Sequence, residues 1–186
     1  TFSTSERRLG GSTIRTLTVA ALALTLFASA PRAEAASLTD NPHSVGLGIG
    51  LSTFSTLATF AMEIPYEYSF KAGPGVLAIH AGFFLAAHQY FVGIGIPLGV
   101  RYKFQITKHP LYVGPTFDIG PIFGVSTGGY SGGSTVGGMI RFGGIVSYLV
   151  HPNVELFFQP VGLGASFTSD GGLFAYTMLL GGQYRF

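Results

Sequence analysis

The sequence predicts an all-β fold: an eight-stranded antiparallel up-and-down transmembrane β-barrel, preceded by a cleavable signal peptide. Three observations support this prediction. Apolar residues alternate with small or polar residues over most of the region 45–186, which is typical of strands with two different faces. Connections rich in Pro, Gly, Asn and Ser separate the alternating segments. Only 10% of the 186 residues are charged, whereas an ordinary soluble surface needs roughly a quarter to a third.

The first 35 residues have the features of a secretory signal peptide. Basic residues precede the apolar stretch 17–30, and Ala33 and Ala35 occupy the small-residue positions of a cleavage site. The apolar stretch is shorter than the roughly 20 residues of a membrane-spanning helix. Cleavage after Ala35 leaves a barrel domain at 36–186 that contains six basic and six acidic residues. Because this domain has no net charge, we expect no nucleic-acid partner.

Eight segments of the barrel domain show the alternation. In one of them the apolar parity shifts by one residue beyond Pro160, which predicts a β-bulge at Gln159–Pro160. The eight predicted strands are 45–51, 60–70, 77–85, 92–104, 113–124, 136–148, 154–167 and 174–186.

The connections between these strands are short enough for a meander of neighbouring antiparallel strands. Three of them are tight turns with Pro, Gly or Asn, at 71–75, 105–110 and 151–153. The other four are built mainly from Ser, Thr, Gly and Ala, near 52–59, 86–90, 126–134 and 168–172. We therefore expect the tight turns at one end of the barrel and the four loops at the other.

The face that carries most of the large apolar side chains is predicted to point outward. Its summed volume exceeds what the interior of an eight-stranded barrel can hold. The opposite face is mostly Gly, Ala, Ser and Thr with a few charges, which would be a poor exterior for a water-soluble barrel. A membrane barrel has the required arrangement, with an apolar band toward lipid and a polar lumen. Closure of such a barrel leaves no backbone group unpaired in hydrocarbon.

The leader, the eight alternating segments and the terminal stretch MLLGGQYRF (178–186) resemble the small outer-membrane β-barrel proteins of Gram-negative bacteria, the OmpA/OmpX-like class. In that class the last strand ends in Phe, and the barrel-assembly machinery reads this strand. The resemblance implies an outer-membrane location, contact with outer-membrane lipid and lipopolysaccharide, and the assembly machinery as a partner; we favour a monomer. Gly182 departs from the pattern. The matching residues of this insertion signal are Tyr176, Met178, Leu180, Tyr184 and Phe186.

A set of polar residues falls on the inward face, where charges need partners of opposite sign. We expect Asp118 to pair with Arg141, and Glu155 with Arg185. A third group is expected to run from Glu67 through His80 to Arg101. The full predicted interior network is Glu63, Glu67, His80, Arg101, Lys103, Asp118, Arg141, Glu155, Gln159 and Arg185.

The network predicts a lumen plugged by polar side chains and a structural or small interaction or stress-related role, without catalytic residues. The sequence indicates no cofactor or metal: Cys is absent, and no outer loop contains two carboxylates. A narrow pore is one alternative, because charges within a membrane are candidates for an ion or proton path. A lipid A-modifying enzyme, by acyl transfer or hydrolysis, is the other. It would use a triad of His88, a Ser such as Ser166 or Ser169, and Asp170.

Overall fold

The computed structural model describes residues 37–54, 57–106, 109–126, 133–168 and 171–186. The predicted signal peptide, residues 1–35, lies outside these ranges and stays a prediction. The described residues form nine β elements: β1 (His43–Phe54), β2 (Leu57–Ala72), β3 (Gly75–His88), β4 (Phe91–Gly95), β5 (Leu98–Gln105), β6 (Leu111–Ser126), β7 (Gly133–His151), β8 (Val154–Thr168) and β9 (Gly171–Arg185).

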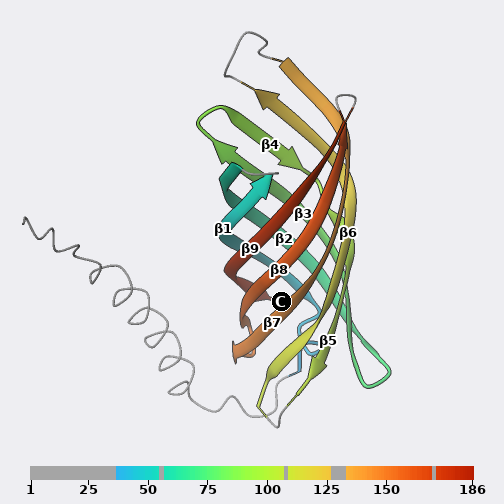
Figure 1. The fold of residues 1–186 in the computed structure, drawn as a ribbon. Coiled ribbons are helices and arrows are strands. Elements are labelled where there is room, and N and C mark those ends of the chain that lie inside the picture. The colour runs from blue at the N-terminus through green and yellow to red at the C-terminus, as the bar shows by residue number, and fades with distance from the viewer. Residues whose placement is uncertain (1–36, 55–56, 107–108, 127–132, 169–170) are drawn as a thin grey trace, which may run out of the picture. The chain divides into compact units, whose positions relative to one another are not determined.

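These elements form one closed antiparallel sheet (Figure 1). Apart from β4 and β5, each element pairs with its neighbour in sequence, and β1 also pairs with β9, which closes the ring. β4 and β5 are two parts of a single strand, since both pair with β3 on one side and with β6 on the other. The prediction of an eight-stranded up-and-down barrel is therefore confirmed. No helix among the described residues is long and apolar enough to cross a membrane.

The structure differs from the predicted strand 92–104 at its centre, where the strand is interrupted between β4 and β5. Pro97 has no N–H to give to the ladder, which accounts for the interruption. The wall stays joined at this point, because Gly82 N–H donates to the carbonyl of Pro97 (2.9 Å) and Ile96 N–H donates to the carbonyl of Pro121 (3.1 Å).

The predicted bulge in β8 is confirmed. Gln159 is opposite Leu179 on β9, and the next paired residues are Gly162 and Thr177, so three steps along β8 match two along β9. The extra residue restores the outward direction of the apolar side chains beyond Pro160. Val161 is consequently exposed on the outside of the barrel.

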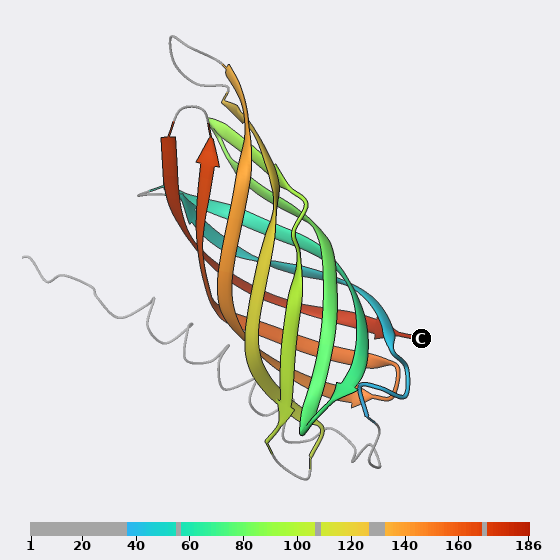
Figure 2. The same cartoon turned by 90° about the vertical axis from the view of Figure 1, so that its right-hand side faces the viewer.

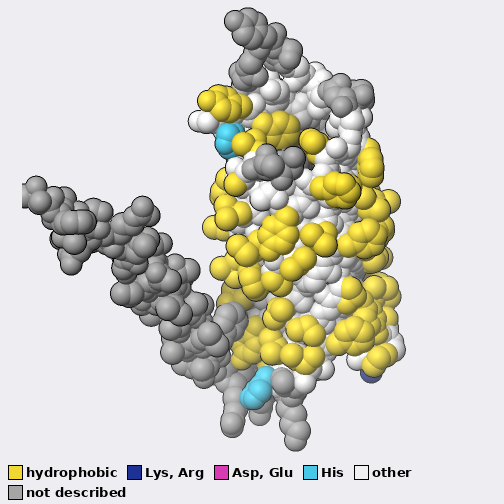
Figure 3. Space-filling view, in the orientation of Figure 1, with side chains coloured by type: hydrophobic (Ala, Val, Ile, Leu, Met, Phe, Trp, Pro, Cys, Tyr) yellow, Lys and Arg dark blue, Asp and Glu magenta, His cyan; other side chains and the backbone are white. Residues whose placement is uncertain are grey.

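The barrel has two ends. The turn end contains the β2–β3, β5–β6 and β7–β8 connections together with Pro42 and Phe186, and the loop end contains the other four connections. The strands are strongly tilted between these ends (Figure 2). The outer face is dominated by hydrophobic side chains (Figure 3). Among the described charged residues, only Asp40 and Lys71 lie outside the lumen, and both are near the turn end.

Glycines on the inward face make room for one large aromatic ring. Phe157 of β8 is buried and lies against the wall formed by β1 and β9. A Cβ added to Gly48 would come within 2.9 Å of its ring, and one added to Gly181 within 2.6 Å. Gly182, the next residue of β9, has only ordinary contacts of 3.5 Å or more at that position. The ring can occupy the lumen only because these two wall positions have no side chain.

We expect G181A to lower the free energy of unfolding by about 1–3 kcal/mol, because the new methyl group overlaps Phe157 and the backbone of β1. The matched control G182A should stay within about 0.5 kcal/mol of the unmodified protein. Urea unfolding of the protein refolded in lipid vesicles measures both values. Equal stability of the two variants would contradict the tight packing at Gly181.

Candidate functional site

The lumen gathers the charged side chains of seven of the strands. Side chains alternate between the two faces of a strand, so charged residues two or four positions apart, such as Arg101 and Lys103 or Glu63 and Glu67, point to the same face. Each side chain in the group is 0–2% exposed, so the structure places all of them inside the barrel. They are Glu63 and Glu67 of β2, His80 of β3, Arg101 and Lys103 of β5, Asp118 of β6, Arg141 of β7, Glu155 of β8 and Arg185 of β9.

The half of the group nearer the loop end is centred on Arg141. Its Nε donates to Oδ2 of Asp118 at 2.9 Å, and its Nη2 lies 2.8 Å from Oε2 of Glu63. Arg101 continues the contacts, since its Nη2 donates to Oε1 of Glu63 at 3.0 Å. Asp118 and Arg141 are directly opposite each other on β6 and β7, which explains their contact.

The half nearer the turn end is centred on Lys103. Its Nζ donates to Glu67 at 2.8 Å and to Glu155 at 2.7 Å. Arg185 Nη1 donates to the other oxygen of Glu155 at 2.5 Å. Arg101 joins the two halves, because its Nη1 donates to Glu67.

Together these contacts form one series in which acids and bases alternate without a break. Four carboxylates and four cations cancel, so the series has no formal net charge. Buried ions need this kind of compensation, because an unpaired charge in a low-dielectric interior is costly. We call it the ion-pair series, and its order is Asp118–Arg141–Glu63–Arg101–Glu67–Lys103–Glu155–Arg185.

Three further polar residues lie in the lumen beside the ion-pair series. His80 lies opposite Glu67 on the neighbouring strand, and its Nε2 is 3.5 Å from Nη2 of Arg101. The same nitrogen is nearest to Glu63, at 3.2 Å, and lies 3.8 Å from Asp118. Gln159 is buried but takes no part in the ion pairs. Gln183, which the sequence analysis did not select, donates from Nε2 to Glu67 at 3.3 Å. The inward parity of β9, shared with Arg185, is the signal that could have identified it.

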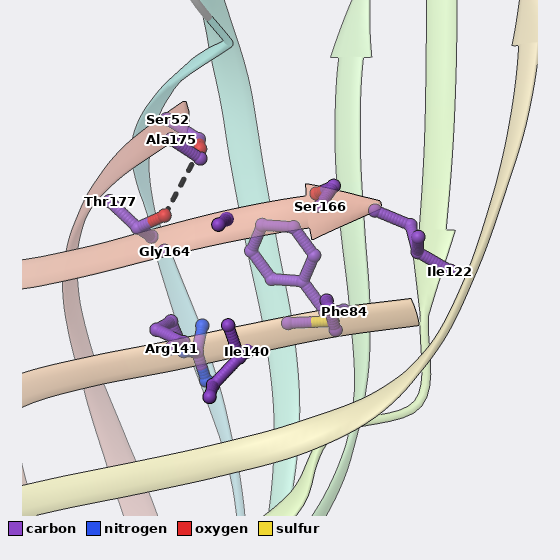
Figure 4. A pocket seen from close by; sticks show the side chains of 11 residues that line it. Ser52, Phe84, Ile122, Ile140, Arg141, Gly164, Ser166, Ala175 and Thr177 are labelled. Carbon is purple, nitrogen blue, oxygen red and sulfur yellow. Dashed lines mark hydrogen bonds between the residues drawn. The ribbon is translucent and has the colours of Figure 1, made fainter. Parts of the chain in front are cut away.

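Apolar side chains close the lumen above the ion-pair series, toward the loop end. The ring of Phe84 covers Arg141, with the guanidinium carbon 5.6 Å from the ring centroid, a favourable cation–π geometry. Phe84 belongs to a buried cluster with Ala61, Ala86 and Ile122, against which Met139 packs. A void of about 20 Å³ remains beside Phe84, room for about one water molecule (Figure 4). The predicted lumen was plugged by polar side chains, so this apolar closure was not expected.

A second closure, which the sequence analysis missed, lies at the turn end. Leu38 is fully buried in a cluster with Val76, Tyr112 and Leu149. Arg185 holds this segment, because its Nη2 donates to the carbonyl of Leu38 (2.6 Å) and its Nε to the carbonyl of Asn41 (3.1 Å). The segment before β1 therefore closes the end of the barrel below the ion-pair series.

The residues of the predicted insertion signal lie on the outer side of β9. Tyr176, Leu180, Tyr184 and Phe186 are exposed, and Met178 is half-buried. The ring of Phe186 stacks on His43 at the start of β1, with centroids 5.8 Å apart. These side chains form an apolar row on the outer face of the last strand, interrupted at Gly182.

The structure does not assemble the hypothetical triad within the described residues. Ser166 faces the lumen near the loop end, whereas the ring of His88 contacts Tyr90 at 5.7 Å. Ser169 and Asp170 lie outside the described ranges. Nor do the described residues contain a group of three or more metal-binding side chains.

Comparison with solved structures identifies the type of barrel. Neisserial surface protein A has a TM-score of 0.57 and 16% identity, over 77% of this chain and 96% of that one. The fold is that of the small outer-membrane β-barrels. The N-terminal β-barrel domain of OprF from Pseudomonas aeruginosa (14% identity, 97% of that chain) and a major outer membrane protein from Thermus thermophilus (15%, 98%) each give a TM-score of 0.53 over 77% of this chain. No protein-family model and no curated protein sequence matches the chain.

We expect E67Q to lower the free energy of unfolding by about 3–5 kcal/mol, because it leaves Arg101 and Lys103 with one carboxylate too few. The double variant E67Q/K103M should recover part of this loss. It divides the series into two neutral groups, one from Asp118 to Arg101 and one of Glu155 with Arg185. Urea titrations of E67Q, K103M and E67Q/K103M give the coupling energy between Glu67 and Lys103. Purely additive losses would contradict the series.

Proposed function

We propose that this protein is an integral outer-membrane β-barrel with a closed lumen and a structural or small interaction role in the membrane. The ion-pair series is the observation that supports this proposal best. It is neutral, fully buried and covered by Phe84 on one side and Leu38 on the other. The nearly uncharged outer face matches a lipid environment, where charged residues on the strands would be costly.

The proposed orientation has the turn end in the periplasm, because membrane barrels have short periplasmic turns and longer outer loops. The predicted signal peptide and the fold likeness to outer-membrane proteins support this location. Lipid and lipopolysaccharide would then surround the barrel. The apolar outer edge of β9 would be the part that the barrel-assembly machinery reads.

A narrow pore is less well supported than a closed barrel. An ion would have to pass the Phe84 cluster, then the mutually paired charges, and then Leu38. Each of these displaces water from the lumen. For the lipid A-modifying enzyme, the described residues provide Ser166 in the lumen but no His beside it.

The insertion signal can be tested with F186S. We expect several-fold less protein in the outer membrane of a Gram-negative host, because the terminal apolar side chain of β9 is lost. The matched control F174S removes an exposed aromatic side chain from the other end of the same strand and should accumulate normally. Membrane fractionation and the heat-dependent gel mobility of the extracted protein measure the effect. Normal insertion of F186S would exclude Phe186 as the recognised residue.

The closed lumen can be tested by planar-bilayer recording. We expect no steady ionic current from the purified protein, because paired charges and apolar side chains fill the path between the two ends. A reproducible unit conductance would support the pore instead.

The mass spectrum of lipid A from cells with and without the protein should be identical, and a change in its acyl chains would support the enzyme.

A further inference from the structure

The loop end contains a cavity of about 280 Å³ that the ion-pair series does not use. We call it the mouth cavity. Phe91, Ile122 and Leu173 supply apolar walls, and Ser126, Thr135 and Ser166 add hydroxyl groups. None of the described residues that line it is charged. Its size is near the lower bound of about 300 Å³ for small-molecule sites, which are likewise mostly apolar with a few polar groups.

The mouth cavity lies at the height of the apolar outer band. Val125, Val136, Phe167 and Phe174 are exposed on the outside of the barrel, at 48%, 63%, 60% and 81%. Each is the sequence neighbour of a residue that lines the cavity, so the wall between cavity and exterior is one strand thick. In the proposed membrane location, lipid chains therefore surround the cavity at its own level.

Among the described residues, the wall around this cavity is lowest where β1 ends. β1 ends at Phe54, which pairs with Ala175 of β9. Residues 171–174 of β9 pair with β8 but have no partner on the β1 side within the described residues. In Figure 1, β1 ends well below the β6–β7 hairpin. Leu173 belongs to this stretch of β9, so an apolar residue of the cavity lining lies where the described wall is lowest.

The bottom of the mouth cavity adjoins the small void beside Phe84. Ile122 and Ser166 line both the mouth cavity and the small void beside Phe84 (Figure 4). Below them, Phe84 covers Arg141. An occupant of the mouth cavity would therefore meet Ile122 and the ring of Phe84 before it met a charged group.

We propose that the mouth cavity binds an aliphatic chain, either an acyl chain of a membrane lipid or that of a free fatty acid. The methylene groups pack against Phe91, Ile122 and Leu173, and the chain enters over the β1–β2 hairpin. Burial of apolar surface drives this binding, and the described lining residues place no charged group against the chain. The inference rests on the proposed membrane location.

The test uses the absence of Trp from the sequence. F91W places a single indole in the mouth cavity, free of background fluorescence. The variant is refolded into phosphatidylcholine vesicles whose acyl chains are brominated, and into unbrominated vesicles to which 12-bromododecanoic acid is added. We expect at least twofold quenching in one of the two arms. Quenching by the brominated lipid identifies a membrane chain, and quenching by the added acid identifies a free one.

Two further substitutions in the F91W background separate cavity binding from quenching through the wall. S166F fills the cavity and L173K puts a charge in its lining, so each should remove most of the quenching. The matched control F174K changes the adjacent residue on the outer face and should leave the quenching unchanged. Quenching that persists in both S166F and L173K, or that is absent from both arms, would overturn the inference. Heat-dependent gel mobility is measured on every sample: a folded but unquenched barrel refutes the binding site alone, whereas absence of a mobility shift refutes the membrane barrel.

Discussion

The pairing of β1 with β9 is the contact on which the other features of this structure depend. A sheet in hydrocarbon cannot leave an edge of N–H and C=O groups unpaired, and this pairing removes the edge. Closure also separates an inside from an outside. Large apolar side chains can then face lipid around the whole ring, and the charged side chains have only the lumen to occupy. The glycines of β1 and β9 permit the close approach of Phe157 to this seam.

Neutrality of the lumen follows from the same constraint. An eight-stranded interior has room for side chains but little room for water, so each charge is compensated by its neighbours. Such ion pairs are weak evidence for stability, since apolar residues of equal volume often serve as well. They do restrict register. A slip of one residue in β5 would turn Arg101 and Lys103 toward lipid and leave Glu67 without its cations.

The sequence was sufficient for the architecture and for the inward direction of the charges, because both follow from a period of two residues. It also predicted the bulge at Gln159–Pro160, where the parity changes. Asp118 and Arg141 could be paired because they are on consecutive strands near the same height. His80 lies opposite Glu67, but its ring is nearest to Glu63, and Arg101 is long enough to reach Glu67 directly; such side-chain reach does not follow from the period of two. Leu38 belongs to a segment without periodicity, so no pattern indicated that it closes the turn end.

That closure by Leu38 has a consequence for the order of assembly. The hydrogen bond from Arg185 to the Leu38 carbonyl joins residues 147 positions apart, almost the full length of the barrel domain. Arg185, which binds the segment at Leu38 near the start of the barrel domain, is therefore among the last residues to be synthesised. Contacts of such long sequence separation form slowly, because much of the polypeptide must be ordered before they can. Until the final strand docks, the segment at Leu38 lacks its hydrogen bond from Arg185 and Glu155 lacks its second cation, so the strand that completes the barrel also neutralises its interior.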